Sequence, residues 1–416
     1  MNEMNRNKDM SKAAPAMSRR LFLETSGSTI LGATAGMLAY VGRAYPAQTD
    51  KKIRLGVVGG GFGAGFHWHQ HPNCVITGVT DLRPERREKL RKNYQCDQVY
   101  DSLEEMLKKA RDIDAVAVFS GAPDHVKHAV MCMERGLHVV SACPACIDLE
   151  EAQTLKEVKE RTGLRYMMAE SSYYRQECIY ARNLYRAGGF GEIFYTEAEY
   201  YHDFPEMHST PEKKGTLFVN PDGSRTWRWG LTPMLYPTHS LGYLVGVTGE
   251  RITRVSCLGW GNADNPALQD NRYDNPFWNQ VACMQTDQGH MLRCNVFWKI
   301  QVPPGGERAQ WFGEKASLYM GRHKLHASFQ APGGKVDIPQ YWKTDMLPES
   351  MRHDSGHGGS AVFLSAEFIN ALIEDREPAC DLYDSLAMTV PGIVANQSSL
   401  KQGEQLPVPQ FDRPKA

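Results

Sequence analysis

Short apolar runs alternate with amphipathic segments between residues 51 and 170. The runs are nearly continuous in Val, Ile, Leu and Ala, which is typical of parallel strands buried on both faces. The segments between them have apolar positions at helical spacing. This alternation predicts an α/β domain with a doubly wound parallel sheet. The predicted strands are 53–58, 75–80, 113–119, 137–141 and 164–169, and the predicted helices are 85–93, 124–135 and 148–161.

The pattern changes after residue 170. Longer segments rich in Tyr, Trp, Val and Phe now alternate apolar with polar positions, which favours a mostly antiparallel sheet with one covered face. We therefore predict a second α/β domain over residues 171–411, with loops at 205–215, 262–275 and 303–306. Its predicted strands are 192–203, 252–260, 277–286 and 290–300, and its predicted helices are 178–187, 238–247, 361–374 and 383–400.

The first 47 residues have the pattern of an export signal. The sequence S-R-R-L-F-L at 18–23 resembles the twin-arginine motif, and the mildly apolar stretch 25–41 after it is too short to span a membrane. We predict a twin-arginine signal peptide cleaved near Ala47, a periplasmic or extracellular location, passage through the twin-arginine export machinery and no stable membrane anchor. A disordered basic tail is the alternative.

Charge and cysteine content narrow the function. The formal net charge is −1, so no basic field exists to attract nucleic acid. The ten cysteines are scattered, and only Cys143 and Cys146 are closely spaced. No second Cys or His pair follows them at a spacing that would complete a metal cluster, so we predict no metal site.

A glycine-rich turn follows the first predicted strand. Gly59, Gly61 and Ala64 match the pattern G-x-G-x-x-A, and Phe62 lies inside the same turn. The first glycine permits a tight turn, the second allows close approach of a pyrophosphate, and the alanine allows a helix to pack on the strand. The sequence therefore predicts a dinucleotide site at the N-terminus of a helix that begins after the turn.

An acidic residue at the end of the second strand supports this prediction. Asp81 lies 20 residues after Gly61, where a carboxylate accepts hydrogen bonds from the adenosine ribose hydroxyl groups. The same carboxylate repels a 2′-phosphate, so NAD is favoured as cofactor. Arg83 nearby leaves NADP possible.

Three further landmarks carry a resemblance to the glucose–fructose oxidoreductase/inositol dehydrogenase (Gfo/Idh/MocA) family. They are His67 after the glycines, the A-P-D-H turn that contains Pro123 and His125, and the G-L-H-V-V strand at 136–140. The resemblance implies that Pro123 and His125 lie beside the nicotinamide ribose. It also implies a tightly bound cofactor, a small carbohydrate substrate and a final helical segment that returns to the first domain.

Two departures from the family pattern bear on catalysis. The family triplet E-K-P aligns with A-C-P at 142–144, so Cys143 stands in place of the lysine. The family pattern D-x-x-x-H aligns with residues 235–239, so only His239 remains. A thiol is neutral or anionic and cannot replace a cation.

The candidate catalytic residues follow from the same alignment. His239 is the predicted general base, because an imidazole of ordinary pKa can take a proton from a sugar hydroxyl. Tyr236, beside the missing aspartate, and Tyr174, at the start of the second domain, are the other predicted proton-transfer residues. Structural roles in capping or core packing are the alternatives. The candidate substrate contacts are Arg175, Trp227, Arg228 and His357.

Three functions remain open. The first is an NAD(P)-dependent oxidoreductase that transfers hydride at a ring hydroxyl of a sugar, polyol or glycoside. The second is an NAD-dependent glycosidase, since the chain also resembles the NAD-dependent α-N-acetylgalactosaminidases in its leader, its domain order and the H-G-G segment at 357–359. The third is a sugar-binding protein without catalysis. The resemblance also implies a possible homo-oligomer through the sheet of the second domain.

Overall fold

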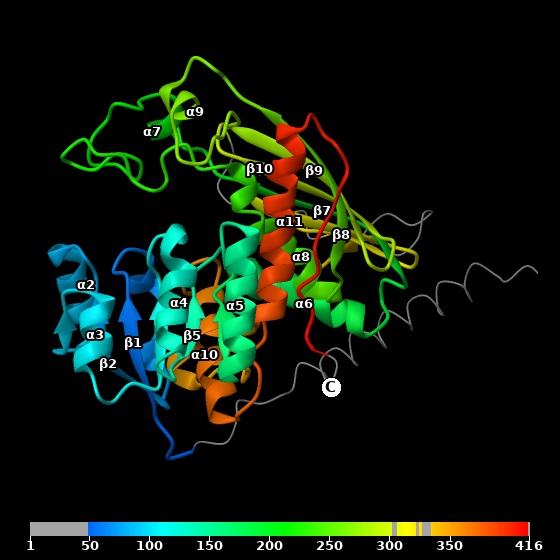
Figure 1. Ribbon diagram of the computed structural model, residues 1–416. Helices are drawn as coiled ribbons and strands as arrows, with labels where there is room; N and C mark the ends of the chain where they lie inside the picture. Colours follow the sequence, from blue (N-terminus) through cyan, green and yellow to red (C-terminus); the bar gives the residue numbers. More distant parts are fainter. Residues whose placement is uncertain (1–48, 302–305, 322–323, 327–333, 415–416) are drawn as a thin grey trace, which may run out of the picture.

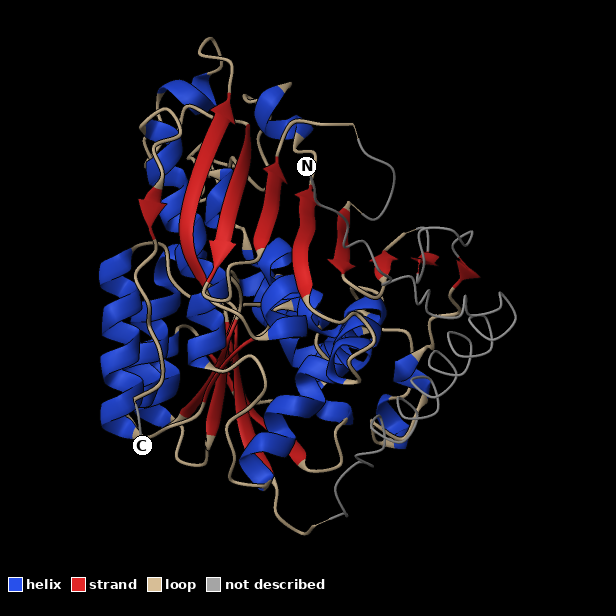
Figure 2. Ribbon diagram, turned by 90° about the vertical axis from the view of Figure 1, so that its right-hand side faces the viewer, coloured by secondary structure: helices blue, strands red, loops and turns tan. Residues whose placement is uncertain are grey.

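The computed structural model describes residues 49–301, 306–321, 324–326 and 334–414, which form two sheets one above the other (Figures 1 and 2). The predicted signal peptide at 1–47 lies outside the described residues, as does most of the predicted loop at 303–306. Within the described part, no helix is both long enough and apolar enough to cross a membrane.

The first domain is built on a six-stranded parallel sheet with the order β3-β2-β1-β4-β5-β6. The strand order reverses between β1 and β4, and in such sheets ligands bind in the crevice outside the carboxyl ends of the strands at this point. The predicted fold class is confirmed. The strands are β1 (Ile53–Val58), β2 (Cys74–Thr80), β3 (Val99–Tyr100), β4 (Ala115–Val118), β5 (His138–Ser141) and β6 (Tyr166–Met168), and the helices are α2 (Pro84–Tyr94), α3 (Leu103–Lys109), α4 (His125–Met133) and α5 (Leu149–Thr162).

The helix predicted directly after the glycine turn is wrong. Two short 3₁₀ turns, Phe62–Gly65 and Trp68–Gln70, stand there instead. Glycines at 63 and 65 make a helix unfavourable, and the backbone of Phe66 is extended at φ −91° and ψ 155°. The Phe66 ring stacks on Trp68 and Phe119, with ring centroids 5.4 and 4.6 Å away. Aromatic burial therefore determines the path of the chain here.

The second domain carries a nine-stranded sheet with the order β14-β13-β12-β11-β7-β10-β9-β8-β15. Its pairs are antiparallel except for β7 and β10, which run parallel. These two strands are joined by a long connection through α8, β8 and β9, so no hairpin forces them to be antiparallel. The strands are β7 (Ile193–Tyr201), β8 (Ile252–Trp260), β9 (Asn279–Thr286), β10 (Met291–Phe297), β11 (Glu307–Gly313), β12 (Ser317–Tyr319), β13 (Lys324–His326), β14 (Gly334–Lys335) and β15 (Leu406–Pro407).

Helices cover one face of this sheet and connect it to the first domain (Figure 2). The long helix α11 packs on β8 and α8 in the second domain and on α5 and β6 in the first. Short one-turn helices interrupt two of the predicted loops. The helices are α6 (Gln176–Arg186), α7 (Pro205–His208), α8 (Thr238–Thr248), α9 (Pro266–Gln269), α10 (Ser360–Ile373) and α11 (Leu382–Leu400).

The opposite face of the sheet carries no helix in the described residues (Figure 2). Leu258 and Trp260 of β8 and Met291 of β10 are more than half exposed there. An uncovered apolar face is compatible with the predicted homo-oligomer, which stays a prediction.

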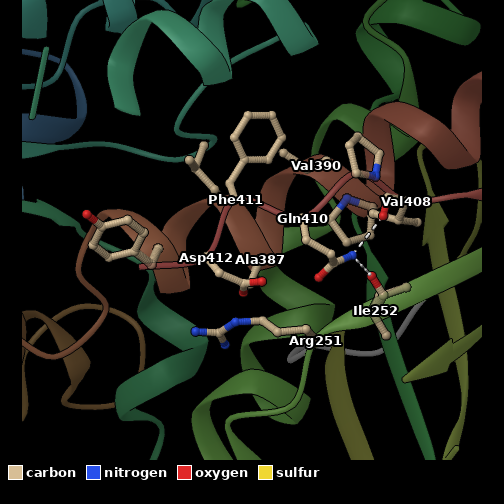
Figure 3. Close-up of a pocket in the computed structure, with 12 residues that line it drawn as sticks. Arg251, Ile252, Ala387, Val390, Val408, Gln410, Phe411 and Asp412 are labelled. Carbon is tan, nitrogen blue, oxygen red and sulfur yellow. Dashed lines mark hydrogen bonds between the residues drawn. The ribbon is translucent and has the colours of Figure 1, made fainter. Parts of the chain in front are cut away.

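The C-terminal segment packs across the seam between α11 and β8 (Figure 3). The Gln410 side-chain amide donates to the carbonyl oxygens of Ile252 and Val408, at 2.8 and 2.7 Å. Farther along, the Arg413 guanidinium donates to the buried carboxylate of Asp381, which caps the N-terminus of α11. The narrow crevice in this figure is therefore a structural seam, and it lies apart from the side chains described below.

Gly242 controls how closely α8 approaches the end of the first domain. A β-carbon at this position would lie 2.1 Å from the Ser172 hydroxyl oxygen. We therefore expect Gly242→Ala to displace Ser172 and to lower the free energy of unfolding by about 1–3 kcal/mol in urea titrations. Gly356→Ala is the control, because nothing lies within 4 Å of its missing β-carbon. Equal effects of the two substitutions would contradict this account.

Candidate active site

A cluster of three buried side chains lies where the two domains meet. Cys143 follows β5 and Glu170 follows β6, so the carboxyl ends of two neighbouring parallel strands place them at one edge of the sheet. His239, in the first turn of α8, comes from the second domain. The exposed fractions are 7% for Cys143, 0% for Glu170 and 8% for His239.

Hydrogen bonds orient the imidazole between the other two groups. His239 Nδ1 donates to Glu170 Oε1 at 2.8 Å, and its Nε2 lies 3.8 Å from the Cys143 sulfur. The same Glu170 oxygen also accepts from the backbone N–H and the hydroxyl of Ser172, both at 2.9 Å. One carboxylate oxygen therefore accepts three hydrogen bonds, two from Ser172 and one from His239.

Electrostatics places a proton on the histidine. Burial opposes a charge on His239, but Glu170 and Cys143 together outweigh burial and raise the pKa of His239 well above its usual value. Burial also opposes ionisation of Glu170, yet His239 outweighs it and lowers the pKa of this carboxyl to about 2. Burial raises the pKa of the Cys143 thiol. At neutral pH the cluster is thus a carboxylate, an imidazolium and a thiol, whereas the sequence predicted an imidazole of ordinary pKa acting as a base.

Aromatic residues surround the free edge of the imidazole. The Tyr200 ring from β7 meets His239 edge-on at 4.5 Å, and the Tyr236 ring lies 6.0 Å away. Burial raises the pKa of Tyr236, although the positive charge of Arg228 opposes this rise. The structure thus brings Tyr236 and Arg228 together with His239, and it adds Tyr200.

The glycine turn fits a dinucleotide. Gly59 has a φ of +98°, and a β-carbon there would lie 2.1 Å from the carbonyl oxygen of Phe119. The position above Gly61 is open, since a β-carbon would meet only the flexible guanidinium of Arg86 at 3.3 Å. Asp81 accepts from the backbone N–H groups of Gly60 and Arg83, at 2.7 and 2.8 Å, which places its carboxylate beside the turn. These features give a pyrophosphate and a ribose the contacts that NAD needs.

A segment of the second domain reaches over this edge of the first (Figure 1). This segment, residues 202–232, joins β7 to the turn before α8 and includes α7. Its Asn220 accepts a hydrogen bond from the Arg83 guanidinium at 2.5 Å. A β-carbon on Gly121 would lie only 2.8 Å from the indole of Trp227, which belongs to this segment. The Arg228 guanidinium lies over the same indole, 4.2 Å from the ring centroid. The segment therefore contacts both sides of the strand-order reversal.

Pro123 and His125 lie in and after a short 3₁₀ turn that follows β4. The His125 ring is buried, with Nδ1 2.8 Å from the carbonyl oxygen of Pro144 and Nε2 3.1 Å from that of Ser120. This ring ties the loop after β4 to the loop that carries Cys143. Its predicted contact with the cofactor stays a prediction.

Tyr174 and Arg175 face other surroundings. The buried Tyr174 ring stacks on Phe363 of α10 with centroids 5.6 Å apart. Arg175 pairs with Glu307 at 3.0 Å and lines a cleft of about 990 Å³. The structure gives Tyr174 packing contacts, and its predicted part in proton transfer stays a prediction.

His357 and Phe62 bring the end of the second domain to the glycine turn. The two rings meet edge-on, with centroids 5.7 Å apart. His357 has a φ of +59°, next to Gly358 and Gly359, whose φ angles are also positive. The predicted H-G-G segment therefore lies beside the dinucleotide turn.

Sequence reasoning missed Glu170 and Tyr200. A signal for Glu170 was present, because an acidic residue directly after a buried parallel strand lies at the edge where ligands bind. Tyr200 gave none, since aromatic residues are ordinary in a half-covered strand. Cys143 was recognised only as the residue that replaces the family lysine. The three cluster residues lie far apart in the chain, with 69 positions between Glu170 and His239 and 96 between Cys143 and His239.

Two segments of the chain match known protein families. Residues 53–170 match the Gfo/Idh/MocA model, an oxidoreductase family with an NAD-binding Rossmann fold. Residues 311–416 match the C-terminal domain of glycosyl hydrolase 109. A glycosyl hydrolase family 109 protein of Streptomyces coelicolor is 24% identical over 458 residues, covering 96% of this chain and 95% of that protein. One of Parabacteroides distasonis is 24% identical over 471 residues, covering 95% and 97%.

Solved structures share the fold. Levoglucosan dehydrogenase in complex with NADH and levoglucosan has a TM-score of 0.71 and 16% identity, covering 87% of this chain and all of that one. The scyllo-inositol dehydrogenase of Lactobacillus casei has a TM-score of 0.63 and 18% identity, covering 86% and 99%. The fold of the two domains is therefore shared with these dehydrogenases.

The loss of stability caused by removing the Glu170 charge should depend on pH. The lowered pKa of Glu170 stabilises the fold above pH 4.5, and this contribution is lost as pH falls through about 2. The raised pKa of His239 stabilises the fold below pH 6.5, and this contribution is lost as pH rises through that raised value. Glu170→Gln should therefore lower the unfolding free energy by about 3 kcal/mol, most strongly between pH 4.5 and 6.5.

Urea unfolding from pH 3 to 9 measures this effect. Asp112→Asn is the control, because it removes a largely exposed partner of Arg54 and should change little at any pH. A loss of stability for Glu170→Gln that is the same at every pH would show that the Glu170–His239 ion pair is not its cause.

Proposed function

Since the chain carries the NAD-binding Rossmann domain of the Gfo/Idh/MocA oxidoreductases and a C-terminal segment of the glycosyl hydrolase 109 type, we propose that it is an NAD-dependent glycosidase. It would cleave a glycoside through oxidation at a ring hydroxyl, elimination, addition of water and reduction. NAD⁺, when bound, accepts hydride from the hydroxyl-bearing carbon and returns it later. The observation that carries the proposal is the buried Glu170–His239 pair beside the dinucleotide edge.

The pair supplies what the missing lysine would have supplied. A positive charge near the reacting hydroxyl stabilises negative charge that develops on its oxygen. The Glu170 carboxylate keeps a proton on His239, so the imidazolium provides that charge where Cys143 cannot. The same proton can pass to a departing oxygen. Because His239 supplies a positive charge in place of the missing lysine, we favour an enzyme over a protein that only binds sugar.

The surrounding side chains suit a carbohydrate. Tyr200 and Tyr236 present flat rings next to His239, and Arg228 adds a donor at the same place. Aromatic faces with polar tips pack on sugar rings while they bond to hydroxyl groups. We therefore propose a small carbohydrate or glycoside as substrate, with Trp227, Arg175 and His357 at the margins of its site.

We also propose that NAD stays bound between turnovers. The segment 202–232 contacts Arg83 through Asn220 and Gly121 through Trp227, so it covers the crevice from both sides. Asp81 beside the ribose position supports NAD over NADP. A closed redox cycle consumes no net NAD, which suits an enzyme that works outside the cytoplasm.

A direct dehydrogenase is the second candidate. The likeness to levoglucosan dehydrogenase favours it, although that likeness concerns the fold. This enzyme would oxidise a free sugar and accumulate one NADH for each product molecule. The two candidates therefore differ in whether NADH accumulates.

The purified full-length protein distinguishes them. We expect near-stoichiometric NAD(H) after denaturation and mass spectrometry, and hydrolysis of nitrophenyl glycosides, beginning with the α-N-acetylgalactosaminide, without added NAD. Oxidation of one ring carbon acidifies the hydrogen on its neighbour, and elimination removes that hydrogen. Hydrolysis in D₂O should therefore place one deuterium in the sugar product.

Each outcome favours or excludes a named function. Hydrolysis without deuterium incorporation would rule out the redox cycle. NADH formation from free sugars without glycoside cleavage would favour the dehydrogenase. A protein that neither contains nor binds NAD(P)(H) would rule out both enzymes.

We further propose export by the twin-arginine route, on the basis of the sequence at 18–23. Replacement of Arg19 and Arg20 together by Lys should leave an uncleaved precursor in the cytoplasm, as judged by fractionation and N-terminal sequencing. Arg43→Lys, in the same leader but outside the motif, is the control. Normal export of the double variant would refute this route.

A further inference from the structure

Three metal-binding side-chain types meet in the cluster described above. Cys143, Glu170 and His239 each offer one possible ligand atom, and these atoms all lie within 4.8 Å of one another. No other group of three His, Cys, Asp or Glu residues in the described chain satisfies this condition. All three side chains are buried. The cluster is therefore a compact set of donors at the end of the Rossmann sheet.

The distances fit two ligands of one metal ion. A thiolate sulfur at about 2.3 Å and an imidazole nitrogen at about 2.0 Å from a tetrahedral zinc ion lie about 3.5 Å apart. Cys143 Sγ and His239 Nε2 lie 3.8 Å apart, so a small rotation of either side chain completes this geometry. Both donors already point toward each other from different domains.

Glu170 stands where metal sites place their orienting carboxylate. Histidine ligands donate their second ring N–H to a carboxylate or carbonyl, which fixes the tautomer and the ring orientation. His239 Nδ1 donates to Glu170 Oε1 at 2.8 Å, which leaves Nε2 for coordination. Two hydrogen bonds from Ser172 keep that carboxylate in place.

We infer that Cys143 Sγ and His239 Nε2 bind a divalent metal ion of the zinc class, with Glu170 as its orienting carboxylate. Thiolate and imidazole together select zinc and similar ions over magnesium or calcium. A zinc ion held by two protein ligands would take water or a sugar oxygen at its remaining positions. A bound metal displaces one proton from the thiol and one from Nε2, so it replaces the imidazolium as the positive charge at this position.

The metal would restore the cation that is lost with the family lysine. A metal ion polarises a hydroxyl oxygen and lowers its pKa without a proton of its own. This role rests on the proposed function, because it needs a sugar hydroxyl at the site. Metal binding itself does not, and it is measured separately from NAD binding.

Cobalt titration of the full-length protein tests the inference. After removal of metal with a chelator, one Co²⁺ per chain should bind and give an intense near-ultraviolet thiolate-to-cobalt band, which added Zn²⁺ removes. Cys143→Ser should abolish the band. Glu170→Gln should keep it and weaken cobalt affinity about 10–100-fold. Cys146→Ser is the control, since this buried thiol lies three positions away and outside the cluster, and its band should be unchanged.

The cobalt spectrum of the wild-type protein tests metal binding, and the spectra of the variants test which residues bind the metal. Absence of a thiolate-to-cobalt band in the wild-type protein overturns the inference, as does a band that persists in Cys143→Ser or disappears in Cys146→Ser. Thermal unfolding verifies that each variant is folded. The NAD content of the same samples keeps the two proposals apart, because a protein that binds cobalt without NAD contradicts the proposed function alone. One that contains NAD and gives no band contradicts the metal site alone.

Discussion

A carboxylate and an imidazole face each other in the interior, one from each domain, and neither is stable there alone. Removing an ion from water costs several kcal/mol, and only a partner with good geometry offsets that cost. Glu170, at the end of the first domain, is fully buried and accepts two hydrogen bonds from Ser172 at the start of the second. His239 enters with α8, whose close approach depends on Gly242. The ion pair therefore links the two domains at the edge where the predicted active-site residues lie.

The rest of the site is organised around this edge. The glycine turn and Asp81 lie at the carboxyl ends of β1 and β2, while Cys143 and Glu170 follow β5 and β6. A parallel sheet brings all of these ends to one side, whatever their separation in the chain. The segment 202–232 then covers the same side from above, through Asn220 and Trp227. The predicted cofactor-binding residues and the cluster of Cys143, Glu170 and His239 thus share one scaffold, although they come from both domains.

Cys143, at the position of the family lysine, changes which residue carries the positive charge of the site. A lysine at position 143 would carry a positive charge itself. With Cys143, the positive charge lies on His239 and depends on the neighbouring Glu170 carboxylate. A cysteine and a histidine at this place are also metal-ligand side chains, which a protonated lysine is not.

Periodicity and spacing determined much of this protein. Five of the six strands of the first domain, the glycine turn with Asp81 and the change of sheet type after residue 170 follow from local patterns, because burial on two faces and the geometry of a tight turn each constrain neighbouring residues. The two-residue strand β3 was not predicted. The sequence failed where distant contacts decide. Burial of Phe66 between Trp68 and Phe119 replaced the expected helix, and β7 paired in parallel with β10 across a long connection. Only the tertiary structure could join Cys143, Glu170 and His239, because no local pattern records which strand ends and helix starts will share one low-dielectric space.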